Sequence, residues 1–198
     1  MRKGFIITVI CLLMILGFGA MQGFHIDEAK AIPRDADILK SEHIDGYGQV
    51  VYFEDNQDRT FGIALLEERF GFLHRYGGGS WDYFDEQDKP FETTGYGNRD
   101  HFVVGVKAAS ESNIKYIAIG NHMENLLPSQ TYELSLQDVK ASPDVYHLKE
   151  MSDLYALFVL NEYTEDTWTI RAFNQDGKLV ADKLFGAEER YLDEEVTK

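Results

Sequence analysis

One segment of the sequence, residues 77–100, gathers the residue types best suited to recognition. It begins with three consecutive glycines, contains six acidic and two basic residues, and has no clear strand pattern. Loops of this length in compact domains are usually functional, and Trp and Tyr rings bring large contact areas at small entropic cost. We therefore predict a binding surface composed of Trp81, Asp82, Tyr83, Asp85 and Tyr96. The alternative is that Trp81 and Phe84 only close the end of a hydrophobic core.

The same segment contains the carboxylates best placed for acid–base catalysis. Glycoside hydrolysis needs two carboxyl groups roughly 5 or 9 Å apart. Asp82 or Asp85 together with Glu92 would provide such a pair for a hydrolase acting on cell-wall polymer. Ser80 lacks the Gly-x-Ser-x-Gly pattern that exposes a nucleophile. Because the chain has 34 acidic residues, a pair alone is weak evidence, so we predict no catalytic residues and keep the hydrolase as an alternative.

The spacing of the histidines and acidic turns is not that of a metal site. His74, His122 and His147 are scattered, and none shows the i, i+2 or i, i+4 spacing of metal ligands. Residues 55–58 resemble part of a calcium loop, but Arg59 stands where a further oxygen ligand is needed, which favours a hairpin turn. We predict no metal site and no cofactor.

The first 21 residues form the strongest signal for location. Arg2 and Lys3 precede an uncharged run over residues 5–21, which as a helix covers about 25 Å of a hydrocarbon core of about 30 Å. Representative apolar positions of this predicted membrane segment are Phe5, Ile10, Leu13, Leu16 and Met21. The positive-inside rule places the N-terminus in the cytoplasm and the rest of the chain outside the cell membrane. Retention as an anchor and cleavage as a signal peptide, which would secrete the protein, both stay open.

The part after residue 21 carries 34 acidic and 17 basic residues and no cysteine. Such an excess of negative charge repels nucleic acid, so nucleic-acid binding is excluded. Without cysteine there is no disulfide, and the exported part must fold on its hydrophobic core alone. Its length suffices for one domain.

The distribution of apolar, charged and β-branched residues divides the chain into four segments. They are a membrane anchor or signal peptide at 1–21, a juxtamembrane stalk at 22–45 with a short helix over 35–43, a β domain at 46–186, and a solvated acidic tail at 187–198. Within the domain, runs rich in Val, Ile, Tyr, Phe and Thr predict strands near 49–54, 60–67, 70–76, 102–107, 114–120, 131–136, 155–162, 167–173 and 178–184. We expect a mainly β fold, an antiparallel meander closed as a sandwich or a half-open barrel.

Three finer expectations concern particular strands. The continuously apolar run 156–160 predicts a central strand covered on both faces. Over residues 167–172 the alternation predicts one wet face that contains Thr169 and Arg171, and Asp176-Gly177 predicts a tight turn. Five aromatic-glycine pairs, among them Phe70-Gly71, are best explained by aromatics that cover glycines at bends, with sugar-binding platforms as the alternative.

The leader up to about Phe24, followed by an acidic β domain with Phe102-Val103-Val104-Gly105-Val106 and the run 114–120, resembles small membrane-anchored envelope proteins of spore-forming Gram-positive bacteria. The resemblance is one of organisation and implies location only. From the aromatic segment 77–100 and the lack of a catalytic pattern, we expect a non-enzymatic extracytoplasmic protein that binds an envelope protein or a wall component. Besides the hydrolase, an immunity or regulatory accessory whose membrane segment contacts a partner helix stays open.

Overall fold

The computed structural model describes residues 2–84, 89–97, 100–123 and 132–192. The chain divides into two compact units, Met1–Ser80 and Trp81–Lys198. The sequence pattern suggests one β domain over 46–186, whereas the structure places the first strands of that range in a unit with the N-terminal segment. Both units consist mainly of antiparallel β sheet, as expected.

The first unit begins with helix α1, Arg2–Met21. Within the described part of the chain, no helix combines the length and the apolar character that crossing a membrane requires. The side chains of Leu13 and Leu16, two of the predicted membrane positions, lie outside the described residues. A four-residue helix, α2 at Glu28–Ala31, comes next, and the Asp27 side chain caps it by accepting a hydrogen bond from the Ala29 amide.

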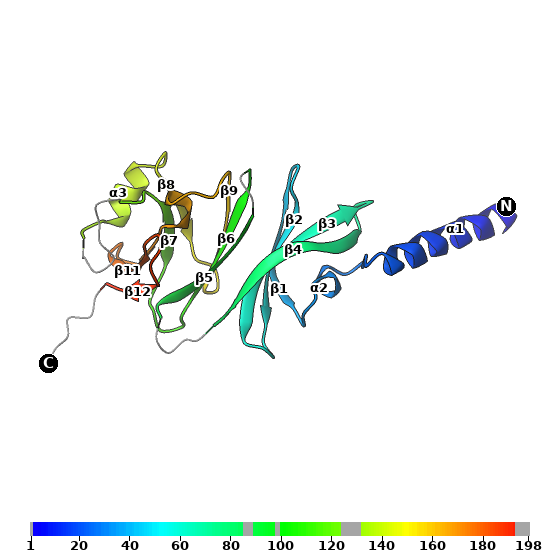
Figure 1. The fold of residues 1–198 in the computed structure, drawn as a ribbon, viewed down its shortest axis with the longest axis horizontal. Helices are drawn as coiled ribbons and strands as arrows, with labels where there is room; N and C mark the ends of the chain where they lie inside the picture. The colour runs from blue at the N-terminus through cyan, green and yellow to red at the C-terminus, as the bar shows by residue number, and fades with distance from the viewer. Residues whose placement is uncertain (1, 85–88, 98–99, 124–131, 193–198) are drawn as a thin grey trace. The chain divides into compact units, whose positions relative to one another are not determined.

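Four strands of the first unit form an antiparallel meander in chain order (Figure 1). They are β1 at Asp37–Ile44, β2 at Gly48–Asp55, β3 at Thr60–Arg69 and β4 at Leu73–Tyr83. Ala31 and Ile32 pack on one face of this sheet against Val51, Phe53 and other core residues. A short apolar segment after α1 is therefore enough to cover that face.

The stalk helix predicted over residues 35–43 is wrong, because these residues contribute to strand β1. Ile38 packs against the core of the first unit, and Asp37 to Ile44 pair with Glu54 to Gly48 of β2. Pairing along a ready sheet edge satisfies the backbone groups that an isolated short helix leaves open.

The long loop predicted over residues 77–100 is also wrong. Residues 77–83 belong to β4, and strand β5 occupies Phe91–Gly97. The glycine run that suggested a loop has a packing role instead: a Cβ on Gly79 would lie 2.3 Å from the carbonyl oxygen of Ile63 in β3. Glycine permits this close approach of two strands.

The second unit contains two further antiparallel sheets. The three-stranded sheet has the order β5-β6-β9, with β6 at Phe102–Ala108 and β9 at Tyr155–Leu160. The five-stranded sheet has the order β12-β11-β10-β7-β8, formed by Arg190–Tyr191, Leu179–Lys183, Ile170–Phe173, Tyr116–Gly120 and Tyr146–Glu150. A short 3-10 helix, η1 at Asp166–Trp168, precedes β10.

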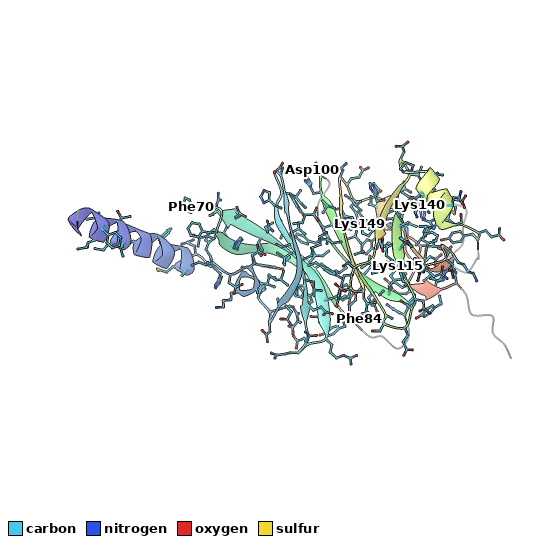
Figure 2. All side chains as sticks on the ribbon, turned by 180° about the vertical axis from the view of Figure 1, so that it is seen from behind. Phe70, Phe84, Asp100, Lys115, Lys140 and Lys149 are labelled. Carbon is cyan, nitrogen blue, oxygen red and sulfur yellow. The ribbon has the colours of Figure 1, made fainter. Side chains whose placement is uncertain are left out.

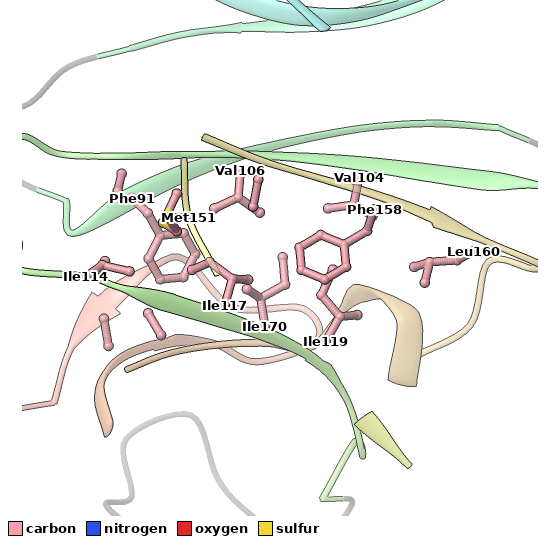
Figure 3. Close-up of a cluster of buried hydrophobic side chains, with 14 of the residues drawn as sticks. Phe91, Val104, Val106, Ile114, Ile117, Ile119, Met151, Phe158, Leu160 and Ile170 are labelled. Atoms are coloured by element: carbon pink, nitrogen blue, oxygen red, sulfur yellow. The ribbon is translucent and has the colours of Figure 1, made fainter. Parts of the chain in front are cut away.

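The main core of this unit lies between the two sheets. Val104 and Phe158 of the three-stranded sheet pack with Ile117, Ile119 and Ile170 of the five-stranded sheet (Figure 3). Helix α3, Leu136–Ala141, contributes Leu136 and Val139 to a smaller cluster with the other face of the five-stranded sheet, and it lies beside β8 (Figure 1). The second unit is thus a two-sheet sandwich with one helix outside.

Several local expectations for this unit are wrong. Strand β9 lies at the end of its sheet rather than in the centre, although most of its residues are buried. The strand predicted over 131–136 is wrong, because residues 132–134 have no regular secondary structure and Leu136 begins α3, where Ser135 and Asp138 form a reciprocal capping box; Thr131 lies outside the described residues. The turn at Asp176-Gly177 is confirmed, with Gly177 at φ +80°.

The predicted wet face of residues 167–172 is buried. Thr169 and Arg171 are both completely inaccessible to solvent, and the rings of Tyr132 and Tyr146 lie 5.5 and 5.7 Å from the Arg171 guanidinium. The predicted solvated tail is wrong for Glu189, which is buried, and residues 193–198 lie outside the described part.

Candidate functional site

The structure divides the predicted binding residues between two strands. Trp81, Asp82 and Tyr83 form the exposed end of β4, with Trp81 39% and Tyr83 71% accessible. Because side chains alternate along a strand, the two rings lie on the same side and Asp82 on the other. Tyr96 is half-buried on β5, and Asp85 lies outside the described residues.

Phe84 differs from its two aromatic neighbours in being buried. The ammonium group of Lys107 lies 4.0 Å from the centre of its ring. Phe84 therefore closes the core, as the alternative interpretation suggested, while Tyr83 and a large part of Trp81 stay accessible to a partner.

Among the described residues, a dense group of charges lies around Lys89, and we call it the Lys89 cluster. Its members are Lys89, Glu92, Thr93, Lys183, Glu188 and Glu189. The Lys89 Nζ atom lies 3.2 Å from Glu92 Oε1 and 3.2 Å from Glu189 Oε2. It also donates to Glu188 Oε2 at 3.1 Å. One ammonium group thus contacts three carboxylates.

Glu189 is the most enclosed carboxylate of the Lys89 cluster. Its Oε1 atom accepts a hydrogen bond of 2.8 Å from the Thr93 hydroxyl and lies 3.3 Å from Lys183 Nζ. Its side chain is almost fully buried, as is that of Lys183. These contacts attach the segment after β11 to strand β5, about 100 residues earlier in the chain.

The two buried carboxyl groups have pKa values displaced in opposite directions. Burial and the nearby charge of Glu189 raise the pKa of Glu92, against the attraction of Lys89; Asp82 adds a further small increase. Burial also raises the pKa of Glu189, but Lys183, hydrogen bonds from a backbone amide and Thr93, and Lys89 outweigh it, and the net pKa is lowered. A split of this kind distinguishes a proton donor from a proton acceptor in acid–base sites.

Lys89 stays charged in this environment. Burial lowers its pKa, but the hydrogen bond to Glu188 and the attraction of Glu189 and Glu92 together raise it above the ordinary lysine value.

The predicted catalytic partner of Glu92 was Asp82 or Asp85, whereas the structure brings Glu92 together with Glu189. The acidic composition of residues 187–198 suggested a solvated end, so Glu189 was not identified as a site residue. The one signal for its burial was Lys89, a single lysine among the acidic residues of 77–100.

A second buried polar group surrounds Arg171. Its guanidinium donates to the carbonyl oxygens of Gly120 and Asn121, the latter at 2.9 Å, and to the Tyr132 hydroxyl at 3.0 Å. Burial raises the pKa of Tyr132, and Arg171 opposes this only in part. Every group here has its partner inside the protein, so the arrangement fixes the end of β7 rather than presenting chemistry to a ligand.

The described residues contain no group of three or more His, Cys, Asp or Glu side chains arranged to hold a metal ion. The calcium-like sequence 55–58 forms the turn between β2 and β3, where Asp55 Oδ1 accepts from the amides of Gln57 and Asp58. The hairpin-turn interpretation of this segment is therefore confirmed.

Comparison of the chain with protein-family models, with curated proteins and with solved structures found no match. Its function is therefore inferred from its own residues and their geometry.

Proposed function

We propose that this protein is a non-enzymatic binding or accessory protein held at the outer face of the cell membrane by α1. The observation that carries the proposal is the exposure of apolar side chains along this helix, up to 85% at Met21. The exposed set comprises Phe5, Ile6, Ile7, Val9, Ile10, Met14, Phe18 and Met21. So many exposed apolar side chains on one helix are unfavourable in water and favourable in lipid.

Charge supports the proposed orientation. Arg2 and Lys3 precede the apolar run, and all the acidic residues come after it, which is the asymmetry of an N-terminus retained in the cytoplasm. Cleavage after export would give a secreted form of the same protein. Cell fractionation with N-terminal sequencing of the mature protein tests both: an intact N-terminus in the membrane fraction supports the anchor, and the intact chain in the soluble cytosol contradicts export.

The partner is an envelope protein or a wall component, and Trp81 and Tyr83 are its contact residues. Aromatic side chains with accessible rings are frequent anchors of interfaces. Replacing both by Ala should abolish capture of the partner from intact cells and leave the melting temperature nearly unchanged, because neither is buried.

Phe84 provides the matched control for this experiment. Phe84→Ala removes a buried ring next to the same two residues and should cost about 3–5 kcal/mol of stability. If the double Trp81→Ala, Tyr83→Ala variant instead loses as much stability as Phe84→Ala, the two exposed rings belong to the core and the proposed contact is wrong.

A hydrolase of wall polymer is the second candidate, because Glu92 and Glu189 each lie 3.2 Å from the same Lys89 Nζ atom and have pKa values displaced in opposite directions. Glu92 would donate the proton and Glu189 would act as the base or nucleophile. Zymography of the purified protein on wall material, with Glu92→Gln as the control, tests this. Absence of clearing from acidic to neutral pH eliminates the hydrolase.

A further inference from the structure

The turn between β3 and β4 has a conformation that its sequence does not favour. Phe70 and Gly71 have φ values of +58° and +73°, and the Phe72 amide donates to the Arg69 carbonyl oxygen at 3.3 Å. Two central residues with positive φ define a type I′ turn, for which Asn-Gly is preferred. A bulky aromatic residue at positive φ is strained by about 1–3 kcal/mol.

Burial of the Phe70 side chain does not offset this backbone strain. Phe70 is 77% exposed at the tip of the hairpin (Figure 2), and Phe72, whose ring centre lies 6.4 Å from that of Phe70, is also exposed. Arg69 beside them is exposed as well. An expectation that Phe70 covers its neighbouring glycine at a bend is therefore wrong, since the ring extends into the surroundings.

The hairpin tip is joined to the end of α1. The backbones of His25 and His74 exchange two hydrogen bonds of 2.7 Å, which fix the segment after α1 along β4. An apolar hollow of about 610 Å³ lies between the helix end and the hairpin. Its lining includes Met14, Phe18, Phe24, Arg69, Phe70 and Leu73.

We propose that the β3–β4 hairpin tip is a lipid-binding surface that inserts Phe70 and Phe72 into the interface of the bilayer holding α1; this rests on the proposed membrane attachment. The exposed apolar surface of α1 continues directly into the hollow and the tip, so one lipid phase covers both. Aromatic rings favour the headgroup level of a bilayer, and Arg69 is placed to meet lipid phosphate.

The tip compensates for an uncharged run of α1 that is shorter than the hydrocarbon core. The uncharged run of the helix covers about 25 Å, less than a hydrocarbon core of about 30 Å. A short membrane segment is accommodated by thinning of the bilayer or by flanking groups that reach the interface. Phe70 and Phe72 supply such groups and strengthen the attachment of the first unit to the lipid surface.

The test uses the full chain in vesicles of phosphatidylcholine and phosphatidylglycerol that contain nitroxide-labelled lipid. Cys11 is the only native cysteine, so an environment-sensitive fluorophore on it reports on α1. In a Cys11→Ser background, Phe72→Cys and, separately, Phe70→Cys report on the tip. Gln57→Cys is the matched control, because it lies in the turn at the opposite end of β3, about 33 Å away along that ten-residue strand.

We expect the lipid nitroxides to reduce emission roughly twofold or more at Cys11 and at the two tip positions, and to leave position 57 unchanged, as for rings buried in the interface. Quenching at Cys11 without quenching at positions 70 and 72 overturns the lipid surface and leaves the anchor intact. Quenching at the tip alone removes the anchor but not the lipid surface. If the tip is shielded from aqueous iodide and not quenched by lipid, another copy or another part of this chain covers it and the inference is wrong.

Discussion

Arg171 and Asp182 lie directly opposite each other on β10 and β11, and both are almost completely buried. Arg171 donates to two backbone carbonyl groups and to Tyr132, while Asp182 accepts two hydrogen bonds from Arg190 of β12, at 2.7 and 3.1 Å. A line of paired polar groups thus crosses four strands, from β12 through β11 and β10 to the end of β7. It holds β12 and the end of β7 in register with the centre of the sheet.

Loss of the Arg171 side chain should be among the most damaging single changes in the second unit. Arg171→Ala leaves two carbonyl groups and a tyrosine hydroxyl buried without their donor, and we expect a loss of about 3–5 kcal/mol in the free energy of unfolding. Thermal and urea denaturation of the full chain measure it. Lys115→Ala is the control: its pair with Glu150 is exposed, so the melting temperature should hardly change.

Glu92→Gln and Glu189→Gln should change stability at neutral pH in opposite directions. The pKa of Glu189 is lowered by folding, so its contribution to stability is present above the ordinary carboxyl value and lost as the pH falls through the folded pKa. The pKa of Glu92 is raised, so its contribution is present below the ordinary value and lost as the pH rises through the folded pKa. Glu189→Gln should therefore lower the melting temperature at neutral pH and Glu92→Gln should raise it.

Calorimetry over a pH series checks this pair. The difference between each variant and the wild type should shrink as the solution becomes acidic, because Glu and Gln then carry the same charge. A loss of stability for both variants, unchanged by pH, would contradict the opposite displacement of the two pKa values.

The glycines of β4 should tolerate a methyl group unequally. A Cβ at Gly79 would lie 2.3 Å from the Ile63 carbonyl oxygen, whereas one at Gly77 would lie 3.2 Å from that of Leu65. Gly79→Ala must push two strand backbones apart, and we expect it to cost about 1–3 kcal/mol. Gly77→Ala should cost clearly less in the same urea titration, and equal effects would refute a specific close approach at Gly79.

Phe70→Asn should make the protein more stable in detergent. Asparagine adopts positive φ more readily than phenylalanine, and Asn-Gly is the preferred sequence of a type I′ turn, so we expect a gain of about 1 kcal/mol. Phe72→Asn serves as the control, since it introduces the same side chain outside the two positive-φ positions and should bring no gain. A Phe70→Asn variant that is no more stable than the wild type would argue against strain in this turn.

Runs rich in β-branched and aromatic residues predicted several of the strands. Residues 60–67 and 102–107 have the β-branched and aromatic composition of strands, and both segments form strands in the structure. The mainly β character followed from the same composition, and the antiparallel arrangement from the lack of helical crossover segments between the predicted strands. Turns that favour glycine, such as the one at Asp176-Gly177, were also predicted correctly from the sequence.

The features that the sequence concealed depend on distant partners. Three glycines suggested a loop at 77–79, because their reason, the close approach of β3, is not visible locally. Arg171 has the polarity of a surface residue, and it is internal because the rings of Tyr132 and Tyr146 lie against its guanidinium. Glu189 belongs to an acidic run, and its enclosure depends on Lys89 and Thr93, far away in the chain. Trp81 and Tyr83 were identified as accessible aromatics, but on a strand rather than a loop.

The order of strands in the five-stranded sheet determines when the second unit can complete its fold. Its inner strands β7 and β10 are separated by about 50 residues, and β11 and β12 come from the last stretch of the chain. The meander of the first unit joins only consecutive strands and can form while translation continues. The second unit can complete its five-stranded sheet only after β10, β11 and β12 have been synthesised, and until then the edge of β7 that pairs with β10 stays open to pairing with other chains.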